Sequence, residues 1–161
     1  MSHDAEFTTA NSVRFERPLP AARAEVWSVL TDTKRLPGWY GEGAIEPRVG
    51  GSVRLMAGHI RGVVTQWAPQ KTLAYTWNVF MPGQEVSDYP ESYLTLQLGA
   101  STLTLSHLPV LERFVKANAM GWQTFLDMVD AAARGQPVEP REAYMKRNAQ
   151  RYGVDLSKLP A

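Results

Sequence analysis

The chain has 161 residues, and 17 Lys and Arg against 16 Asp and Glu leave a formal net charge of +1. This length fits one domain with a sizeable core, and 44% hydrophobic with 20% charged residues is the composition of a globular rather than a disordered protein. The near-neutral charge argues against nucleic-acid binding, and the lack of cysteine excludes disulfides, thiolate nucleophiles and cysteine-based zinc or iron–sulfur sites.

The N-terminal segment is small, polar and aperiodic over residues 1–11, which predicts a flexible tail. It has no charged segment followed by an apolar stretch, and nowhere do about 18 apolar residues run together. We therefore expect a cytoplasmic protein without a membrane span. Alternating apolar and charged residues then predict a first strand over residues 12–19.

Helical spacing follows the first strand. Apolar residues at i and i+4 predict a helix over residues 22–30. Asp32 is a typical helix N-cap, and it indicates a second short helix over residues 32–36 that Pro37 and Gly38 end. We therefore expect one strand to lead into two short helices.

Between residues 41 and 107 the period of the pattern is mostly two, and turn residues recur at intervals suited to an antiparallel meander. Six strands are predicted here, over residues 44–47, 52–57, 59–67, 72–80, 92–98 and 102–107. Large side chains alternate with small polar ones in several of these segments, so we expect one face of the sheet to be buried. A long connection over residues 81–91 is either a lid or an ordinary loop.

A period near 3.6 returns over residues 112–134 and predicts a long helix, which Gly135 ends. Asp127 and Asp130 are expected on its solvated side. A basic accessory helix is predicted over residues 140–153, either packed back on its own domain or free to dock on a partner. We therefore divide the chain into a tail, a domain over residues 12–135 and a C-terminal extension over residues 136–161.

Sequential antiparallel strands with segregated helices predict an α+β fold with about seven strands in the order β-α-α-β₆-α. One long helix cannot cover so wide a sheet. A curved sheet around that helix would leave a hollow, and hollows lined by apolar and aromatic side chains bind small ligands.

Local motifs add a family resemblance. They are the segment Pro20–Asp32, Trp39, the pair Gly50-Gly51, the strands Leu73–Trp77 and Leu103–His107, and the pair Gly121-Trp122. In order and spacing they resemble the START-like, helix-grip superfamily, also labelled SRPBCC. Within it they are similar to the Aha-type branch, named for the C-terminal domain of the activator of the heat-shock protein 90 ATPase. The resemblance implies a curved antiparallel sheet wrapped around a long C-terminal helix, but no particular reaction.

Two of the three histidines are candidate polar residues of the hollow. His107 follows Leu103 and Leu105 at two-residue spacing, so it should share their buried face. It is either a polar contact or proton shuttle at the cavity mouth, or a core histidine bonded to a backbone carbonyl. His59 lies at an expected hairpin and is a weaker candidate. No third ligand stands at a metal-binding spacing, and no cofactor is indicated.

Aromatic and methionine side chains supply the remaining candidates, because they offer large and adaptable apolar contact area. The same residues could instead fill a solid core. The full set of ligand-cavity candidates is Trp39, Met56, His59, Trp67, Tyr75, Trp77, Tyr93, His107, Trp122, Phe125 and Met128.

No catalytic constellation is found in the sequence. Ser106 precedes His107 but should face the opposite side of its strand, which argues against a Ser–His pair. We therefore expect a protein that binds a small hydrophobic molecule. The alternatives are a chaperone ATPase activator that binds a protein partner, as the resemblance implies, and a cyclase- or hydratase-type enzyme that uses His107 or Tyr93. Either a monomer or a homodimer fits the sequence.

Overall fold

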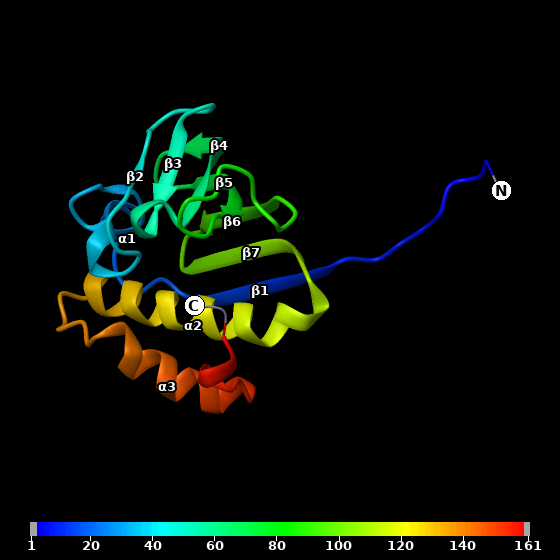
Figure 1. The fold of residues 1–161 in the computed structure, drawn as a ribbon. Coiled ribbons are helices and arrows are strands. Elements are labelled where there is room, and N and C mark those ends of the chain that lie inside the picture. The colour runs from blue at the N-terminus through cyan, green and yellow to red at the C-terminus, as the bar shows by residue number, and fades with distance from the viewer. Residues whose placement is uncertain (1–2, 160–161) are drawn as a thin grey trace.

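The fold, seen in a computed structural model that describes residues 3–159, is a seven-stranded antiparallel sheet with its α-helices on one face (Figure 1). The strands are β1 (Asn11–Pro18), β2 (Ala44–Ile45), β3 (Ser52–Leu55), β4 (Ile60–Ala68), β5 (Thr72–Val79), β6 (Ser92–Leu98) and β7 (Thr102–Val110). The helices are α1 (Arg23–Thr31), α2 (Val115–Ala133) and α3 (Arg141–Tyr152), with short 3-10 turns η1 (Leu36–Gly38), η2 (Met56–Gly58), η3 (Glu112–Phe114) and η4 (Leu156–Lys158).

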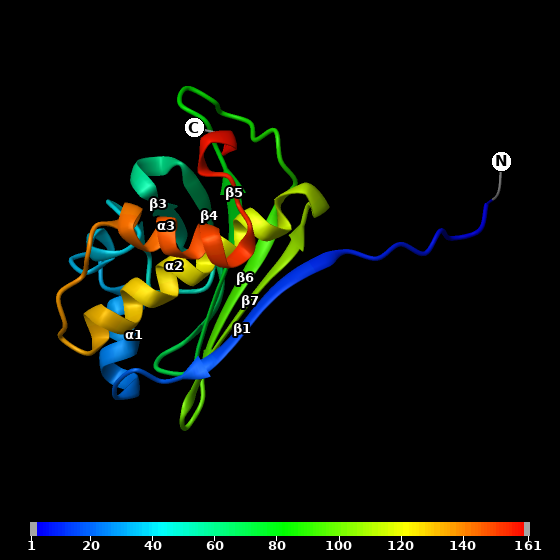
Figure 2. The ribbon, with the colours of Figure 1, turned by 90° about the horizontal axis from the view of Figure 1, so that it is seen from below.

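The strand order is β1-β7-β6-β5-β4-β3-β2, so the first strand pairs with the last. All six neighbouring pairs are antiparallel. The long helix α2 lies across the sheet, and α3 packs on the side of α2 that faces away from it (Figures 1 and 2). The predicted α+β helix-grip architecture is confirmed.

Several predicted boundaries differ from the structure. The strand predicted over residues 44–47 ends at Ile45, and the strand predicted over residues 102–107 continues to Val110. Three further differences have a local cause. The second short helix over residues 32–36 is instead a turn followed by η1, because the Asp32 side chain accepts a hydrogen bond from the Lys34 amide inside a tight turn. The strand predicted over residues 52–57 ends at Leu55, where the backbone turns into η2. The long helix begins only at Val115, because η3 takes up its predicted first turn.

The core lies between the sheet and α2. Alternate residues of β7 are buried, and His107 is 3% exposed beside the fully buried Leu105, as the two-residue spacing predicts. Trp39 donates a hydrogen bond to the Val29 carbonyl of α1 and stacks on Tyr40, with ring centroids 3.6 Å apart. The Tyr40 hydroxyl bonds the Tyr75 hydroxyl at 2.6 Å, and burial raises the pKa of both groups, so both stay neutral.

A polar cluster fastens α3 to α2 and β1. Arg17 of β1 donates to Asp127 and Asp130 of α2 at 3.2 Å each. The buried Asn148 of α3 donates to Asp127 at 3.1 Å and to the Thr124 hydroxyl at 3.2 Å. The two aspartates are therefore half-buried and paired rather than fully solvated, because Arg17 contacts both and Asn148 contacts Asp127.

The two ends of the chain are described in part. Residues 3–10 are exposed and extend away from the sheet, and Asn11 opens β1 opposite Val110 (Figure 1). The first two residues of the predicted tail and the last two of the predicted extension lie outside the described residues. The accessory helix is α3, and it ends at Gly153 in the left-handed conformation with φ 65°.

Candidate ligand cavity

A cavity of about 540 Å³ lies between α2 and the sheet. Its walls come from η2, the ends of β4 to β7, the loop of residues 80–91, η3, α2 and α3. Pockets that hold small molecules have volumes of roughly 300 to 1,000 Å³. The cavity is therefore large enough for a small organic ligand.

The long walls of the cavity are apolar. Ile60, Trp77 and Val79 line it from the sheet. On α2, Phe125 and Gly121 line it at four-residue spacing, so they share one helix face. A Cβ atom built at Gly121 meets no other atom within 4 Å, which means that this glycine widens the cavity.

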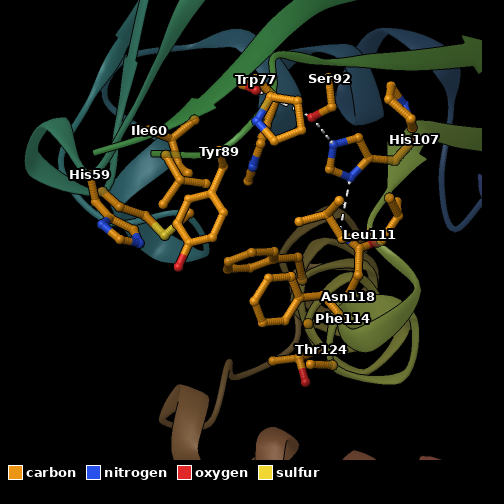
Figure 3. Close-up of a pocket in the computed structure, with 18 of the residues that line it drawn as sticks. His59, Ile60, Trp77, Tyr89, Ser92, His107, Leu111, Phe114, Asn118 and Thr124 are labelled. Carbon is orange, nitrogen blue, oxygen red and sulfur yellow. Dashed lines mark hydrogen bonds between the residues drawn. The ribbon is translucent and has the colours of Figure 1, made fainter. Parts of the chain in front are cut away.

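The loop of residues 80–91 and η3 form one end of the cavity. Tyr89 of the loop meets Phe114 of η3 edge to face, with ring centroids 5.8 Å apart. Figure 3 shows His59 and Ile60 beside Tyr89. Aromatic edges of this kind offer a ligand both apolar area and a polar hydroxyl.

A buried polar cluster stands at the β6–β7 side of the cavity. His107 Nε2 lies 2.7 Å from the Ser92 hydroxyl oxygen (Figure 3). On the other side of the ring, Nδ1 lies 3.1 Å from the Asn118 amide nitrogen and 3.0 Å from Trp122 Nε1. Asn118 Oδ1 is buried without a hydrogen-bond partner.

The tautomer of His107 follows from these partners. The indole N–H of Trp122 can only donate, so His107 Nδ1 accepts and the ring proton of the neutral histidine is on Nε2. That proton is donated to Ser92, whose own hydroxyl donates to the Trp77 carbonyl at 3.2 Å. Burial lowers the pKa of His107 to about 4, so the ring is neutral at pH 7.

The arrangement limits what Ser92 can do chemically. A serine nucleophile needs an unprotonated histidine nitrogen to accept its proton. Here the nitrogen beside Ser92 carries the ring proton, so the pair orients polar groups and does not activate the hydroxyl. His107 is bonded to side chains rather than to a backbone carbonyl, which differs from the core-histidine alternative considered above.

Helix α3 closes the cavity next to η2. Arg141 and Met145, one turn apart, both line it. Arg141 Nη2 donates to the Trp39 carbonyl at 2.8 Å, and its guanidinium carbon lies 5.1 Å from the centroid of the Phe125 ring. Burial lowers the pKa of Arg141 from its usual value.

The comparison with protein families agrees with this geometry. The family model described as Activator of Hsp90 ATPase homolog 1-like protein matches residues 20–134. The chain belongs to this family. The resemblance to the Aha-type branch of the START-like superfamily is thereby confirmed, and α3 lies after the last residue of the match.

Solved structures of other proteins have a fold similar to that of this chain. CalU16 from Micromonospora echinospora has a TM-score of 0.70 at 23% identity, over 89% of this chain and 87% of that chain. An HSP90 activator from Plasmodium falciparum has a TM-score of 0.64 at 18% identity, over 78% of this chain and 97% of that chain. These identities establish the fold alone. No curated protein matches the chain.

Five of the eleven candidate residues line the cavity. They are Met56, His59, Trp77, His107 and Phe125. Met56 is presented by η2, where it and Ala57 adopt the left-handed conformation with φ of 49° and 55°. The Nδ1 atom of His59 lies 2.9 Å from the Phe80 carbonyl, which links η2 to the start of the long loop.

Four other candidates do not line the cavity. Three of them are buried in the core, and Trp67 is partly buried against it. Trp39 is buried and donates a hydrogen bond to the Val29 carbonyl of α1, and the Tyr75 hydroxyl is hydrogen-bonded to that of Tyr40. Trp122 is buried and donates a hydrogen bond from its indole nitrogen to His107. Trp67 packs against Trp27 near the opposite end of β4 from Ile60, with ring centroids 5.1 Å apart. The structure therefore places these four outside the cavity lining.

The last two candidates point elsewhere. Tyr93 follows Ser92 on β6, and strand alternation puts it on the outer face, where it is 50% exposed. Met128 lines a separate hollow beside Pro37 and Val138. Neither residue lines the cavity between α2 and the sheet.

Sequence reasoning missed several lining residues. Asn118 stands four and seven residues before Trp122 and Phe125, a helical spacing that could have revealed it. Ser92 meets His107 only through the pairing of β6 with β7. Arg141 and Met145 carry no local signal, because their contribution depends on where α3 docks.

The described residues contain no group of three or more His, Cys, Asp or Glu side chains placed to hold a metal ion. Within residues 3–159, none of the helices is long and apolar enough to cross a membrane.

Proposed function

We propose that this protein binds a small, largely apolar molecule in the cavity between α2 and the sheet. The observation that carries the proposal is a partly open, apolar and aromatic cavity of about 540 Å³ between α2 and the sheet. A cavity of this kind costs stability, because its lining loses van der Waals contacts that a filled core would have. Its presence is explained if a ligand supplies those contacts.

Polar groups at the walls would orient the ligand rather than react with it. Ser92 and His107 satisfy one another, and His107 is neutral. No Asp or Glu is found among the lining residues of the described chain to act as a general acid or base. The geometry therefore favours binding over the cyclase- or hydratase-type alternative.

The test uses Gly121, because it faces the cavity and has free space around it. Gly121→Leu should occupy part of the cavity while helix propensity stabilises α2 by about 0.5–1 kcal/mol. The neutral probe N-phenyl-1-naphthylamine should bind the parent protein 1:1 by fluorescence titration. Gly121→Leu should weaken it by about tenfold or more, equivalent to 1.4 kcal/mol.

Gly121→Ala is the matched control, because it adds one methyl group and should keep probe affinity within about twofold. Failure of the probe to bind the parent protein, or equal binding by Gly121→Leu, would overturn the proposal. In native mass spectrometry, any small molecule that co-purifies with the parent should be missing from Gly121→Leu. The same spectra report whether the protein is a monomer or a homodimer.

The family match supports a second candidate, activation of a chaperone ATPase through a protein surface. One solved neighbour is itself named as an HSP90 activator. A direct assay of the cognate chaperone ATPase tests this candidate. Stimulation that Gly121→Leu leaves unchanged would favour a surface function, and no stimulation by the parent would count against it.

A further inference from the structure

Among the described residues, the cavity lining carries one positively charged side chain, Arg141, and no negatively charged one. The Arg141 guanidinium therefore faces an apolar space without a carboxylate opposite it. Partly desolvated cations are stabilised by a paired anion.

The Arg141 guanidinium has N–H donors without a hydrogen-bond acceptor among the described residues. Nη2 donates to the Trp39 carbonyl, and this is the only hydrogen bond that the described residues give the side chain. Nε is buried without a partner. Arg141 forms no ion pair with any of the described residues. The charge of the adjacent Glu142 acts on it only at longer range.

The position of Arg141 is held from two sides. Its guanidinium lies over the Phe125 ring, and its backbone begins α3. The bonds of Asn148 to Asp127 and Thr124 fasten that helix to α2. A donor group that is already held in place loses less entropy when it binds a ligand.

We propose that Arg141 is an anion-binding subsite of the cavity and that the ligand is an amphipathic organic anion, with an apolar body and one carboxylate, sulfonate or phenolate group. This inference rests on the proposed function. The apolar body would lie between Trp77 and Phe125, and the anionic group would accept hydrogen bonds from the Arg141 guanidinium. The subsite comes from α3, which lies outside the part of the chain that matches the family.

Two fluorescent probes that differ by one sulfonate test the proposal. 8-Anilinonaphthalene-1-sulfonate is the anionic probe, and N-phenyl-1-naphthylamine is its neutral counterpart. The parent protein should bind the sulfonate more tightly. Arg141→Met should weaken sulfonate binding by roughly tenfold, because charged hydrogen bonds contribute about this much, and should change neutral-probe binding less than about twofold.

Two further variants control for charge and for folding. Arg151→Met removes the same charge from an exposed position of α3 and should leave both affinities unchanged. Arg141→Lys keeps the charge but not the planar fork, so it should retain part of the preference for the sulfonate. Circular dichroism and thermal unfolding establish that each variant is folded.

The outcomes separate this inference from the proposed function. If neither probe binds the parent protein, the proposed function fails. A different set of results would overturn only the anion subsite. In that case both probes bind the parent protein and Gly121→Leu lowers the affinity for both. Arg141→Met then either lowers the two affinities equally or leaves the affinity for the sulfonate unchanged. Sulfonate binding that Gly121→Leu does not reduce would place that probe outside the cavity and would also overturn the subsite.

Discussion

At the scale of single residues, His107 shows how neighbouring donors set the state of a titratable group. Trp122 and Asn118 both approach Nδ1, so a proton there would face two donors instead of an acceptor. The same ring is 3% exposed, and water cannot stabilise its charge. His107 therefore serves as a neutral connection between β6, β7 and α2.

The low pKa of His107 predicts a dependence of stability on pH. Between about pH 6.5 and pH 4 the unfolded chain binds a proton at this position and the folded chain does not, so the free energy of unfolding should fall as the pH is lowered through this window. The slope is at most about 1.4 kcal/mol per pH unit, and the total is about 3 kcal/mol. Titration of the ring by NMR should give a pKa near 4.

Urea unfolding at pH 7 and pH 5 provides the second measurement for this prediction. His107→Gln should lose much of the difference in stability between the two pH values. Leu108→Gln, at an exposed position of the same strand, should keep the difference of the parent protein. Equal pH dependence of the parent and His107→Gln would contradict the assignment.

At the scale of elements, α3 is a wall of the cavity because of how it is attached. Its buried contacts include Tyr144 and Asn148, while most of its charged side chains are exposed. The Tyr152 hydroxyl donates to Gln123 of α2 at 3.0 Å, near the other end of the helix. Polar bonds of this kind determine the register of α3 along α2 as well as its attachment.

Loss of the Asn148 amide should loosen α3 selectively. Asn148→Ala removes one buried and one half-buried hydrogen bond and should lower the free energy of unfolding by about 1–3 kcal/mol. In hydrogen exchange followed by mass spectrometry, the amides of α3 should lose more protection than those of β6 and β7. The control is Asn78→Ala, which breaks a bond to the exposed Glu91 and should cost less than about 1 kcal/mol. Uniform loss of protection across the chain would contradict selective loosening.

At the scale of the whole molecule, one core connects all the main elements. It includes residues of α1, η1, β2 to β7, α2 and α3. Arg17 adds β1 to the same unit through its two bonds to α2. Elements that share a core in this way are expected to unfold together.

We therefore expect one cooperative unfolding transition. Tryptophan fluorescence reports on the core around Trp39, Trp77 and Trp122, and far-ultraviolet circular dichroism reports on all helices, α3 included. The two signals should give coincident urea transitions, with an m-value of about 1–3 kcal/mol per molar urea. An earlier transition seen only by circular dichroism would show that α3 unfolds before the rest.

The sequence by itself determined the class of fold, because it depends on patterns that are local. Two-residue alternation marked the strands and predicted that His107 is buried. A 3.6-residue spacing with Gly135 marked the long helix, and a basic segment that starts at Pro140 and ends at Gly153 marked the accessory helix. The family resemblance added the grip of the sheet on the long helix. Local patterns were least accurate at η1 and η2, where side-chain bonds and left-handed residues redirect the backbone.

The tertiary structure alone decided which of the apolar residues surround a space and which fill the core. Trp39 and Trp77 look alike in the sequence, but Trp39 bonds Val29 behind α1 whereas Trp77 faces the cavity. Ser92 reaches His107 through strand register, and Arg141 reaches the cavity because α3 docks on α2. These contacts join residues distant in the chain, and their geometry follows from the packing of the whole domain rather than from any local pattern.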